Sequence, residues 1–157
     1  MDKFQITKEG YQKLKADLEN LKNVERVKVI TAIAEAREHG DLKENAEYHS
    51  AKDKQGFIEA QIADLEDKFV RAEIVDISKL SGNKVKFGAT VGLEDMDSGK
   101  KVIYKIVSEF EANIDDGLIS NNSPVARFLT NKEVGDVVEV KTPGGAVSYE
   151  ILEIKFV

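Results

Sequence analysis

The sequence predicts an α+β fold, with a long antiparallel helical hairpin followed by a small sheet domain. The first observation behind this prediction is a pair of apolar stripes whose members recur in alternating steps of three and four, as in a helical seam. They are Tyr11, Leu14, Leu18 and Leu21, and then Ile62, Leu65, Phe69 and Ala72. The stripes are mirror images about a point between residues 41 and 42. A chain that folds back there buries one stripe against the other, with Tyr11 opposite Ala72 and Leu14 opposite Phe69.

The second observation is a change of period after Ala72, from the helical 3.6 to the alternation of a strand. Strands are predicted at residues 73–78, 85–91 and 101–107, and residues 136–141 and 146–156 form a hairpin over Thr142-Pro143-Gly144-Gly145. Ser123 and Pro124 start a short helix that covers Val125–Leu129, since Ser favours the N-cap and Pro the first helical position. We therefore divide the chain into a hairpin domain, residues 1–75, and a globular domain, residues 76–157.

The first helix is predicted to begin after Thr7 as N-cap and to end near Glu38. Within it the seam drifts, because Val24, Val27, Ile30 and Ile33 follow one another in steps of three, which indicates a local change of twist. The second helix contains Gly56, which costs about 1 kcal/mol relative to Ala inside a helix. The mirror places Gly56 opposite Val27, so close packing there is the expected reason for the glycine.

The turn of the hairpin has the residues that such a turn requires. Gly40 suits the positive φ at which helices end, Asp41 is a good N-cap, and Glu44 follows at capping-box spacing. Each arm of about 30 residues extends roughly 45 Å. Near the turn the side chains are small, which allows close approach of the helices: Ala32, Ala34, Ala36, Ala46, Ser50 and Ala51. A thin hairpin with an acidic end suggests that this end is inserted into an opening in another molecule.

Composition narrows the classes of function. The 157 residues include no Cys, so disulfides and thiolate metal sites are excluded, and the net charge is -6. A protein that holds nucleic acid through its phosphates is usually basic, so any contact with nucleic acid must be local or made through a partner. The N-terminus lacks the pattern of a signal peptide, and no apolar run approaches the roughly 20 residues of a membrane span. We expect a cytoplasmic protein without a membrane partner.

Asp41 and Glu44 have two compatible interpretations. In the first they form a capping box and only stabilise the start of the second helix. In the second they are a pair of carboxylates suited to a hard divalent cation. Two carboxylates are too few for a complete metal site, but Mg²⁺ keeps several waters and often shares ligands with a substrate's phosphates. Asp41 and Glu44 could then complete a metal site whose other ligands come from another molecule.

Other charged and aromatic side chains gather near the turn. Arg37, Lys43, Lys52 and Lys54 are either part of a solvated, charge-mixed helix face or contacts for phosphate. Tyr48 is either a packing residue or a platform on which a base stacks. His39 and His49 are interpreted as turn and surface residues, and Ser123 lacks the His and Asp partners of a hydrolase triad.

Several motifs resemble the Gre family of bacterial transcript cleavage factors, and the likeness covers nearly the whole chain. The most specific is the turn, residues 40–49, Gly-Asp-Leu-Lys-Glu-Asn-Ala-Glu-Tyr-His, with Ala34-Glu35-Ala36-Arg37-Glu38-His39 before it. In the second half the matching motifs are Leu118-Ile119-Ser120, Ser123-Pro124-Val125-Ala126-Arg127 and Lys141-Thr142-Pro143-Gly144-Gly145. One departure is Asn131, where the family usually has Gly; since Asn also tolerates the left-handed conformation, we expect the same turn.

The resemblance implies an elongation factor of bacterial RNA polymerase that is not itself an enzyme. The globular domain would have an FKBP-like fold and dock on the rim of the polymerase's secondary channel, through residues that include Ser123, Pro124 and Arg127. The hairpin would enter the channel, where Asp41 and Glu44 help to hold a Mg²⁺ of the polymerase and position a water that cuts backtracked RNA. Arg37, Lys43, Tyr48 and Lys52 would contact the RNA 3′ end or the channel. The free protein is expected to be monomeric, with no cofactor of its own.

Three other functions remain open from the sequence. One is an inhibitor of the same architecture that plugs the channel without promoting cleavage, although its tip would be expected to differ in carboxylate number and spacing. A second is a peptidyl-prolyl isomerase with a helical arm, but such enzymes use an aromatic-lined pocket and this chain has no Trp. The third is a coiled-coil adaptor in which Asp41 and Glu44 only cap a helix.

Overall fold

A computed structural model describes residues 2–41 and 44–157 of the chain. Its contacts divide the chain into two compact units, a helical hairpin (residues 11–72) and a sheet unit (Lys3–Gly10 with Glu73–Val157). The predicted α+β fold, with a long helical hairpin ahead of a sheet domain, is confirmed. Residues 3–10, which the sequence analysis assigns to the hairpin domain, belong to the sheet unit in this division.

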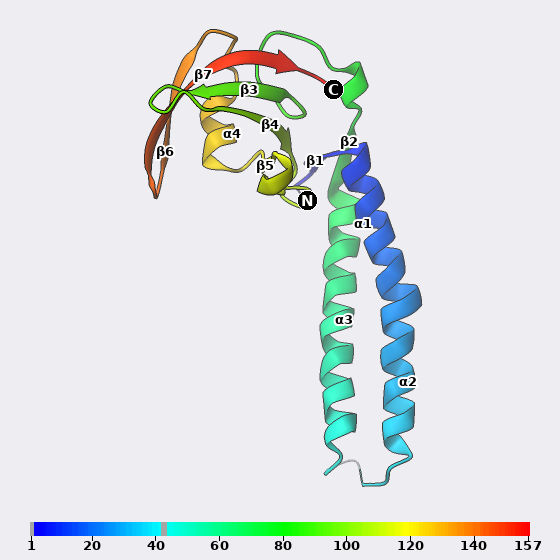
Figure 1. The fold of residues 1–157 in the computed structure, drawn as a ribbon. Helices are drawn as coiled ribbons and strands as arrows, with labels where there is room; N and C mark the ends of the chain where they lie inside the picture. The colour runs from blue at the N-terminus through cyan, green and yellow to red at the C-terminus, as the bar shows by residue number, and fades with distance from the viewer. Residues whose placement is uncertain (1, 42–43) are drawn as a thin grey trace. The chain divides into compact units, whose positions relative to one another are not determined.

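The hairpin consists of two long helical arms that run antiparallel (Figure 1). The first arm comprises α1 (Lys8–Asn20), a π-helical turn (Leu21–Glu25) and α2 (Arg26–Arg37), and the second arm is α3 (Ala46–Arg71). The hydroxyl of Thr7 accepts a hydrogen bond from the backbone N–H of Gly10 at 3.0 Å, which confirms Thr7 as the residue that caps α1.

Apolar side chains between the arms hold the hairpin together. Val29, Ile58 and Ile62 are at most 3% exposed and form a cluster against which Leu18 and Leu21 pack. Burial of each such aliphatic side chain contributes about 1.5–3 kcal/mol. Farther from the turn, the rings of Tyr11 and Phe69 stack with their centroids 4.7 Å apart. Tyr11 therefore lies nearer the turn than the mirror predicted, opposite Phe69 rather than Ala72.

The π-helical turn explains both this shift and the drift of the seam. A π-turn places an extra residue in one helical turn, so the first arm reaches less far than its residue count suggests. Because the turn takes up one extra residue, it also changes by one position which residues of α2 face α3, and Val29 is buried there. The predicted change of twist is therefore real, but Val24, Val27 and Ile30 do not continue the seam, because they are 39%, 53% and 50% exposed.

Charged pairs cross the hairpin at its edges. The guanidinium of Arg26 donates two hydrogen bonds to the carboxylate of Glu59, at 2.7 and 2.8 Å. This contact raises the pKa of Arg26 and lowers the pKa of Glu59.

The prediction of close packing between the arms at Gly56 is wrong, because a Cβ at that position would meet nothing within 4 Å.

The sheet unit is built on five strands in the order β5-β4-β3-β7-β6. All neighbours are antiparallel except β4 and β5, which are parallel. The strands are β3 (Thr90–Asp95), β4 (Lys101–Val107), β5 (Leu118–Ser120), β6 (Val137–Thr142) and β7 (Gly145–Lys155). A separate two-stranded sheet pairs β1 (Phe4–Thr7) with β2 (Ala72–Val75).

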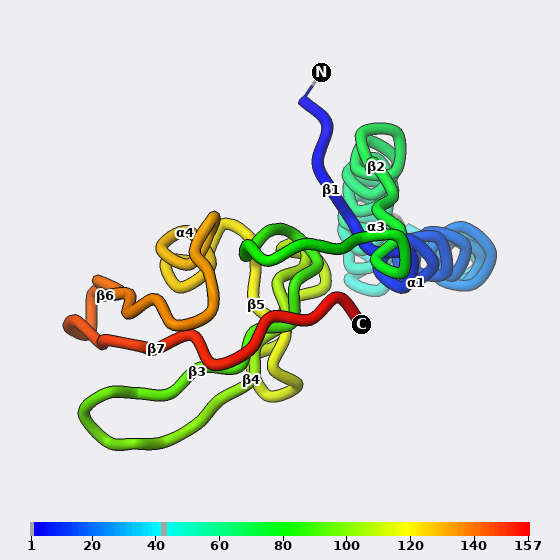
Figure 2. Tube along the Cα trace, turned by 90° about the horizontal axis from the view of Figure 1, so that it is seen from above, coloured from blue at the N-terminus to red at the C-terminus, as the bar shows by residue number. Residues whose placement is uncertain are grey.

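One helix, α4 (Pro124–Leu129), lies along one side of the five-stranded sheet (Figure 2). Its Ala126 and Leu129 are buried in the main core together with residues of all five strands, among them Leu93, Ile106, Ile119, Val140 and Ile151. The predicted short helix, the 101–107 strand and the hairpin over residues 142–145 are confirmed. Asn131 has a φ of 68°, which confirms the left-handed turn expected there.

The predicted strands differ from the structure in three places. Residues 85–91 do not form one strand, because Gly88 takes a φ of 88° in a turn and the backbone of Val85 bonds to Asn131 and Lys132 instead. The strand predicted at 73–78 ends at Val75, where Asp76 caps a short 3₁₀ turn, Ile77–Lys79. The short parallel strand β5 was not predicted.

A carboxylate in the loop after β4 fastens the N-terminal segment to the sheet unit. Glu111 accepts hydrogen bonds from the backbone N–H of Thr7 at 3.3 Å and from the Thr7 hydroxyl. It also accepts from the N–H and hydroxyl of Ser108, at 3.1 and 2.8 Å. Thr7 and Ser108 are at most 2% exposed. A Cβ on Gly10 would overlap the carboxyl carbon of Glu111, which gives a steric reason for glycine at that position.

Within the described residues, no helix is both long and apolar enough to span a bilayer.

Candidate functional site at the hairpin tip

The tip of the hairpin begins where α2 ends at Arg37 and finishes where α3 begins at Ala46. The backbone leaves α2 through a turn in which the N–H of His39 bonds to the carbonyl of Ala36 at 3.1 Å. Gly40 follows with a φ of 107°, a conformation that costs a glycine little. This confirms the role predicted for Gly40 at the end of the first helix.

Asn45 caps α3 and ties the two arms together. Its side-chain oxygen accepts from the backbone N–H of Tyr48 at 3.1 Å, and its amide nitrogen donates to the carbonyl of Ala36 at 2.6 Å. The prediction that Asp41 is the N-cap of the second helix, with Glu44 completing a capping box, is therefore wrong. An Asp at position 45 would keep the acceptor but lose the donor, so only the amide satisfies both helix ends.

Asp41 and Glu44 lie on the loop between the two arms, and both are exposed. Leu42 and Lys43 lie outside the described residues, so the predicted contact at Lys43 is not placed. Carboxylate oxygens are ligands that Mg²⁺ prefers, and an exposed pair suits a cation that keeps part of its water shell. In the described part of the chain, no three His, Cys, Asp or Glu residues are grouped to hold a metal. Two carboxylates supply only part of a Mg²⁺ coordination shell, so water or a partner would supply the rest.

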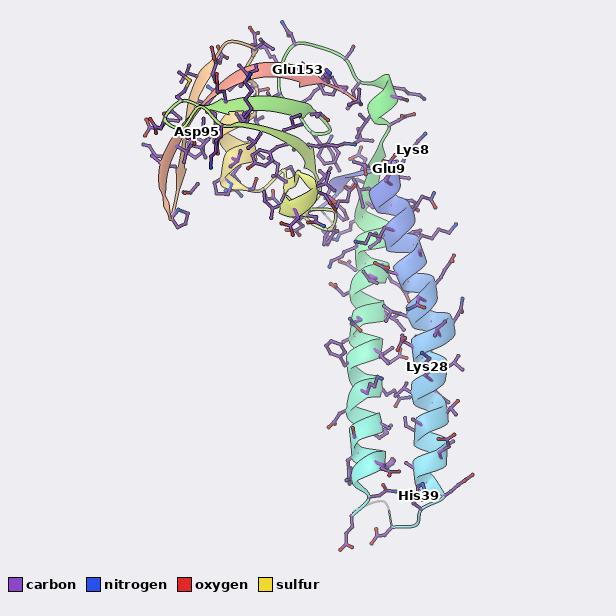
Figure 3. The ribbon with its side chains drawn as sticks, in the orientation of Figure 1. Lys8, Glu9, Lys28, His39, Asp95 and Glu153 are labelled. Carbon is purple, nitrogen blue, oxygen red and sulfur yellow. The ribbon has the colours of Figure 1, made fainter. Side chains whose placement is uncertain are left out.

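A third carboxylate lies at the start of α3. The Oε2 of Glu47 is 3.6 Å from the Nε2 of His39, across the tip from the end of α2. His39 marks the tip in Figure 3. The contact adds a second link between the two arms beside that of Asn45.

The structure brings together three of the four residues predicted to contact RNA or the channel. The guanidinium of Arg37 is 6.0 Å from the centroid of the half-buried Tyr48 ring, a cation–π distance. Lys52 follows Tyr48 by four residues, so it lies on the same side of α3. It is exposed, and its Nζ donates to Gln55 at 3.1 Å. These side chains form a basic and aromatic edge behind the carboxylates.

The predicted docking residues gather at the start of α4. The Ser123 hydroxyl accepts from the N–H of Ala126 at 3.3 Å and donates to the carbonyl of Ser120 at 2.7 Å, so Ser123 is the predicted N-cap. Pro124 and Arg127 are exposed. Phe128, which the sequence analysis did not select, is 38% exposed beside them.

Comparison with known proteins covers both units. Residues 4–74 match a family model described as transcription elongation factor, N-terminal, and residues 80–156 match one described as transcription elongation factor, GreA/GreB, C-terminal. The chain belongs to the GreA/GreB family. Transcription elongation factor GreA of Phenylobacterium zucineum is 57% identical over 157 residues, which cover all of both chains. GreA of Caulobacter vibrioides is 55% identical over 156 residues, 99% of each chain.

Solved structures of GreA/GreB relatives are also similar. The crystal structure of GreA factor homolog 1 (Gfh1) from Thermus thermophilus is 32% identical, with 98% of this chain and 99% of that chain covered and a TM-score of 0.44.

The Thr142-Pro143-Gly144-Gly145 turn, which joins β6 and β7, favours the GreA branch of the family, and the two relatives above carry that name.

Asn45 is the residue of this Gre tip that the sequence analysis missed. Its signal was present, since Asn is a preferred N-cap and Ala46 begins an uninterrupted helical stretch. Asp41 offered an equally good local pattern, and only the bond to the carbonyl of Ala36 across the tip decides between them.

Proposed function

We propose that this chain is a transcription elongation factor that stimulates bacterial RNA polymerase to cleave backtracked RNA, so that synthesis resumes from a new 3′ end. The observation that carries the proposal is the position of Asp41 and Glu44. Both are exposed at the end of a narrow hairpin, and neither caps the helix that follows, because Asn45 does so. Both residues therefore lie at the tip without serving as the cap of α3.

The hairpin acts by carrying these carboxylates through the secondary channel to the polymerase active site. Asp41 and Glu44 place negative charge where a Mg²⁺ of the polymerase is held, and orient a water toward the RNA phosphate. The Mg²⁺, when bound, supplies Lewis-acid activation of that water. The polymerase remains the catalyst, and this chain contributes ligands that are preorganised by the rod.

The basic and aromatic edge behind the tip would hold the RNA. Arg37 and Lys52 attract the phosphates near the 3′ end, and Tyr48 offers a ring on which a base stacks. Lys43 is assigned the same role from the sequence. Because the whole chain is acidic, with a net charge of -6, attraction for RNA must come from a local basic surface such as this edge.

The sheet unit would dock on the rim of the channel through the α4 surface with Ser123, Pro124 and Arg127. This division of labour leaves the hairpin free to reach inward from a fixed base. We place the protein in the cytoplasm, where the polymerase works, and we propose that it is monomeric when free, because a thin rod must enter the channel as a single copy.

An inhibitor that only plugs the channel is the second candidate, since it requires the same rod and the same docking surface. The exposed carboxylate pair favours cleavage, because plugging alone gives no reason to place two acids on the loop. The isomerase and adaptor hypotheses explain the tip less well, since the first makes no use of it and the second needs Asp41 or Glu44 as a cap.

The deciding experiment replaces Asp41 with Asn and, separately, Glu44 with Gln. Each variant keeps the size of the side chain but removes the charge at the metal, and comparable electrostatic deletions at catalytic sites lower rates roughly 100- to 1000-fold. Neither residue caps α3, so thermal stability should change by less than about 0.5 kcal/mol. Stimulated cleavage is measured on halted elongation complexes, and binding by competition with the wild type.

The matched control is Asp53→Asn, an exposed carboxylate on α3 away from the tip, which should cleave normally. Raising Mg²⁺ should restore part of the activity of Asp41→Asn and Glu44→Gln if the carboxylates help to hold the metal. Wild-type cleavage by both variants would refute the proposed role of the tip. A wild-type chain that binds and blocks the polymerase without stimulating cleavage would establish the inhibitor instead.

A further inference from the structure

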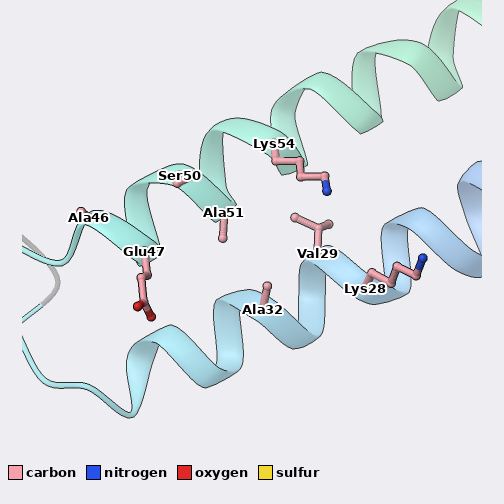
Figure 4. Close-up of a pocket in the computed structure, with 8 residues that line it drawn as sticks. All are labelled: Lys28, Val29, Ala32, Ala46, Glu47, Ser50, Ala51 and Lys54. Carbon is pink, nitrogen blue, oxygen red and sulfur yellow. The ribbon is translucent and has the colours of Figure 1, made fainter.

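Two grooves lie between the arms of the hairpin. The one nearer the tip has a volume of about 430 Å³, and its lining is shown in Figure 4: Lys28, Val29, Ala32, Ala46, Glu47, Ser50, Ala51 and Lys54. The other, farther from the tip, has a volume of about 350 Å³ and is lined by Asp17, Asn20, Leu21, Gln61, Asp64 and Leu65. Small and aliphatic side chains form much of the first groove, whereas acids and amides dominate the second.

Both grooves open on the same face of α3. Five of the eight α3 residues that line them continue in steps of three and four through one residue that lines neither, Phe57, and such steps keep to one helix face. The stripe is Glu47, Ser50, Lys54, Phe57, Gln61 and Asp64. Phe57 is 65% exposed, although burial of such a ring is strongly favourable. A large apolar side chain thus stands in solvent between two grooves.

Charge changes sign along this face. Lys28 and Lys54, one from each arm, line the groove nearer the tip, and Asp17 and Asp64, again one from each arm, line the other. Lys54 and Asp64 are ten residues apart, about 15 Å along the helix. Some of these charges already have partners within the chain, since Asp64 bonds to Lys68 at 2.7 Å and Lys28 lies 3.9 Å from Glu25. From the tip outward, the face therefore carries the carboxylate of Glu47, the two lysines, the apolar ring of Phe57 and then the two aspartates.

This face is not the one proposed to contact RNA. Lys52 is two residues from both Ser50 and Lys54, and two residues in an α-helix turn by about 200°. Tyr48 stands in the same relation to Ala46 and Ser50. The hairpin thus has a basic and aromatic edge on one side of α3 and the grooved face on the other.

We propose that the grooved face receives an amphipathic α-helix of RNA polymerase. An acidic side chain of that helix lies between Lys28 and Lys54, an apolar side chain packs on Phe57, and a basic side chain approaches Asp17 and Asp64. The small side chains Ala32, Ala46, Ser50 and Ala51 allow the backbone of a helix to come close. A separation of about 15 Å matches nearly three turns of a helix laid along the rod. The identity of the partner rests on the proposed function.

RNA and a second copy of this chain fit the face less well. Glu47, Asp17 and Asp64 would repel phosphates along most of its length. A stable dimer usually buries 1,200 Å² or more with an apolar centre, and a single-file stripe around Phe57 offers little such area. A helix of a partner that is already docked elsewhere needs only a weak contact, because its effective concentration is high.

Binding to core polymerase without nucleic acid tests the proposal, with Phe57→Ala and Lys54→Glu as variants. Truncation of a central contact residue typically weakens binding several-fold to about tenfold, and we expect Kd to rise by that factor for each. The matched controls are Val27→Ala, an exposed aliphatic residue that lines neither groove, and Lys13→Glu, an exposed lysine of α1 that also lines neither. Both controls should bind as the wild type does.

A crosslink identifies the occupant. The chain has no Cys, so Phe57→Cys carries the sole thiol and takes a photoreactive label there. We expect a crosslink to a helical polymerase segment in which an acidic and a basic residue stand about ten positions apart. A crosslink to RNA, or a crosslink between two copies that grows with protein concentration, would overturn the proposal.

Unchanged binding of both Phe57→Ala and Lys54→Glu would also overturn it. In that case a wild type that still binds and stimulates cleavage leaves the proposed function standing, and only the grooved face is rejected. A wild type that neither binds polymerase nor stimulates cleavage rejects both.

Discussion

The carboxylate of Glu111 accepts four hydrogen bonds from Thr7 and Ser108, whereas that of Glu44 stands exposed on the loop at the hairpin tip. The surroundings of Glu111 are crowded enough to exclude a Cβ on Gly10, but along α3 a Cβ on Gly56 would meet nothing. A glutamate thus stabilises the fold of the sheet unit, whereas at the tip, by our proposal, a glutamate takes part in chemistry. Glu111 is held by four hydrogen bonds, and Glu44 is exposed to solvent.

The largest effect should come from Glu111→Ala. Its removal leaves the buried donors of Thr7 and Ser108 without their acceptor, and we expect the free energy of unfolding of the sheet unit to fall by about 3 kcal/mol. Urea denaturation measures this change. The matched control, Glu109→Ala, removes an exposed carboxylate two residues away, and Glu44→Ala removes the one at the tip; both should stay within about 0.5 kcal/mol of the wild type. Equal losses of unfolding free energy in Glu111→Ala and Glu44→Ala would show that the two carboxylates do not differ in their contribution to stability.

A smaller effect is expected for Asn45→Ala, which removes the helix cap next to the tip carboxylates. Loss of the cap should cost about 1–2 kcal/mol of local stability at the start of α3. The exchange rate of the Tyr48 amide proton, whose acceptor is the Asn45 side chain, should rise by about tenfold, and stimulated cleavage should fall as the tip loosens. Asn45→Asp keeps the cap acceptor, so it should protect the Tyr48 amide while losing the bond to Ala36. Wild-type exchange in Asn45→Ala would show that the cap does not hold the tip.

The smallest effect is a stabilisation. Gly56→Ala adds a methyl group in open space within a helix, which should raise the stability of the hairpin by about 0.5–1 kcal/mol. Thermal denaturation measures the gain, and cleavage should be unchanged. A drop in cleavage without a drop in stability would mean that a partner approaches the backbone at Gly56.

The sequence predicted those elements in which local pattern and tertiary packing agree. The steps of three and four around Leu14, Leu18 and Leu65 predicted the hairpin, since the same residues that favour a helix also form its seam. Ser123 and Pro124 predicted α4, and Thr142–Gly145 predicted the turn between β6 and β7, because cap and turn residues act within a few positions.

The failures depend on contacts distant in the chain. Val85–Val91 has the alternation of a strand, but the bonds of Val85 to Asn131 and Lys132 are invisible to a local pattern. Asp41 and Asn45 are both acceptable caps, and the carbonyl of Ala36, nine residues before Asn45, selects the latter. For the candidate site, the sequence placed Asp41, Glu44, Arg37, Tyr48 and Lys52 near one another, yet it did not distinguish a capping carboxylate from an exposed one.

The π-helical turn at Leu21–Glu25 shows how the rod can absorb a change in length. An insertion of one residue in a seam normally rotates every later side chain by about 100° and ruins the match with the partner helix. A wider turn takes up the extra residue on the spot, so the two stretches of the first arm each keep their apolar side toward α3. The two arms can therefore differ in length by one residue without a change in the position of the tip. For a hairpin that, by our proposal, must extend to a fixed distance, this allows the number of residues in an arm to vary while Asp41 and Glu44 keep their place.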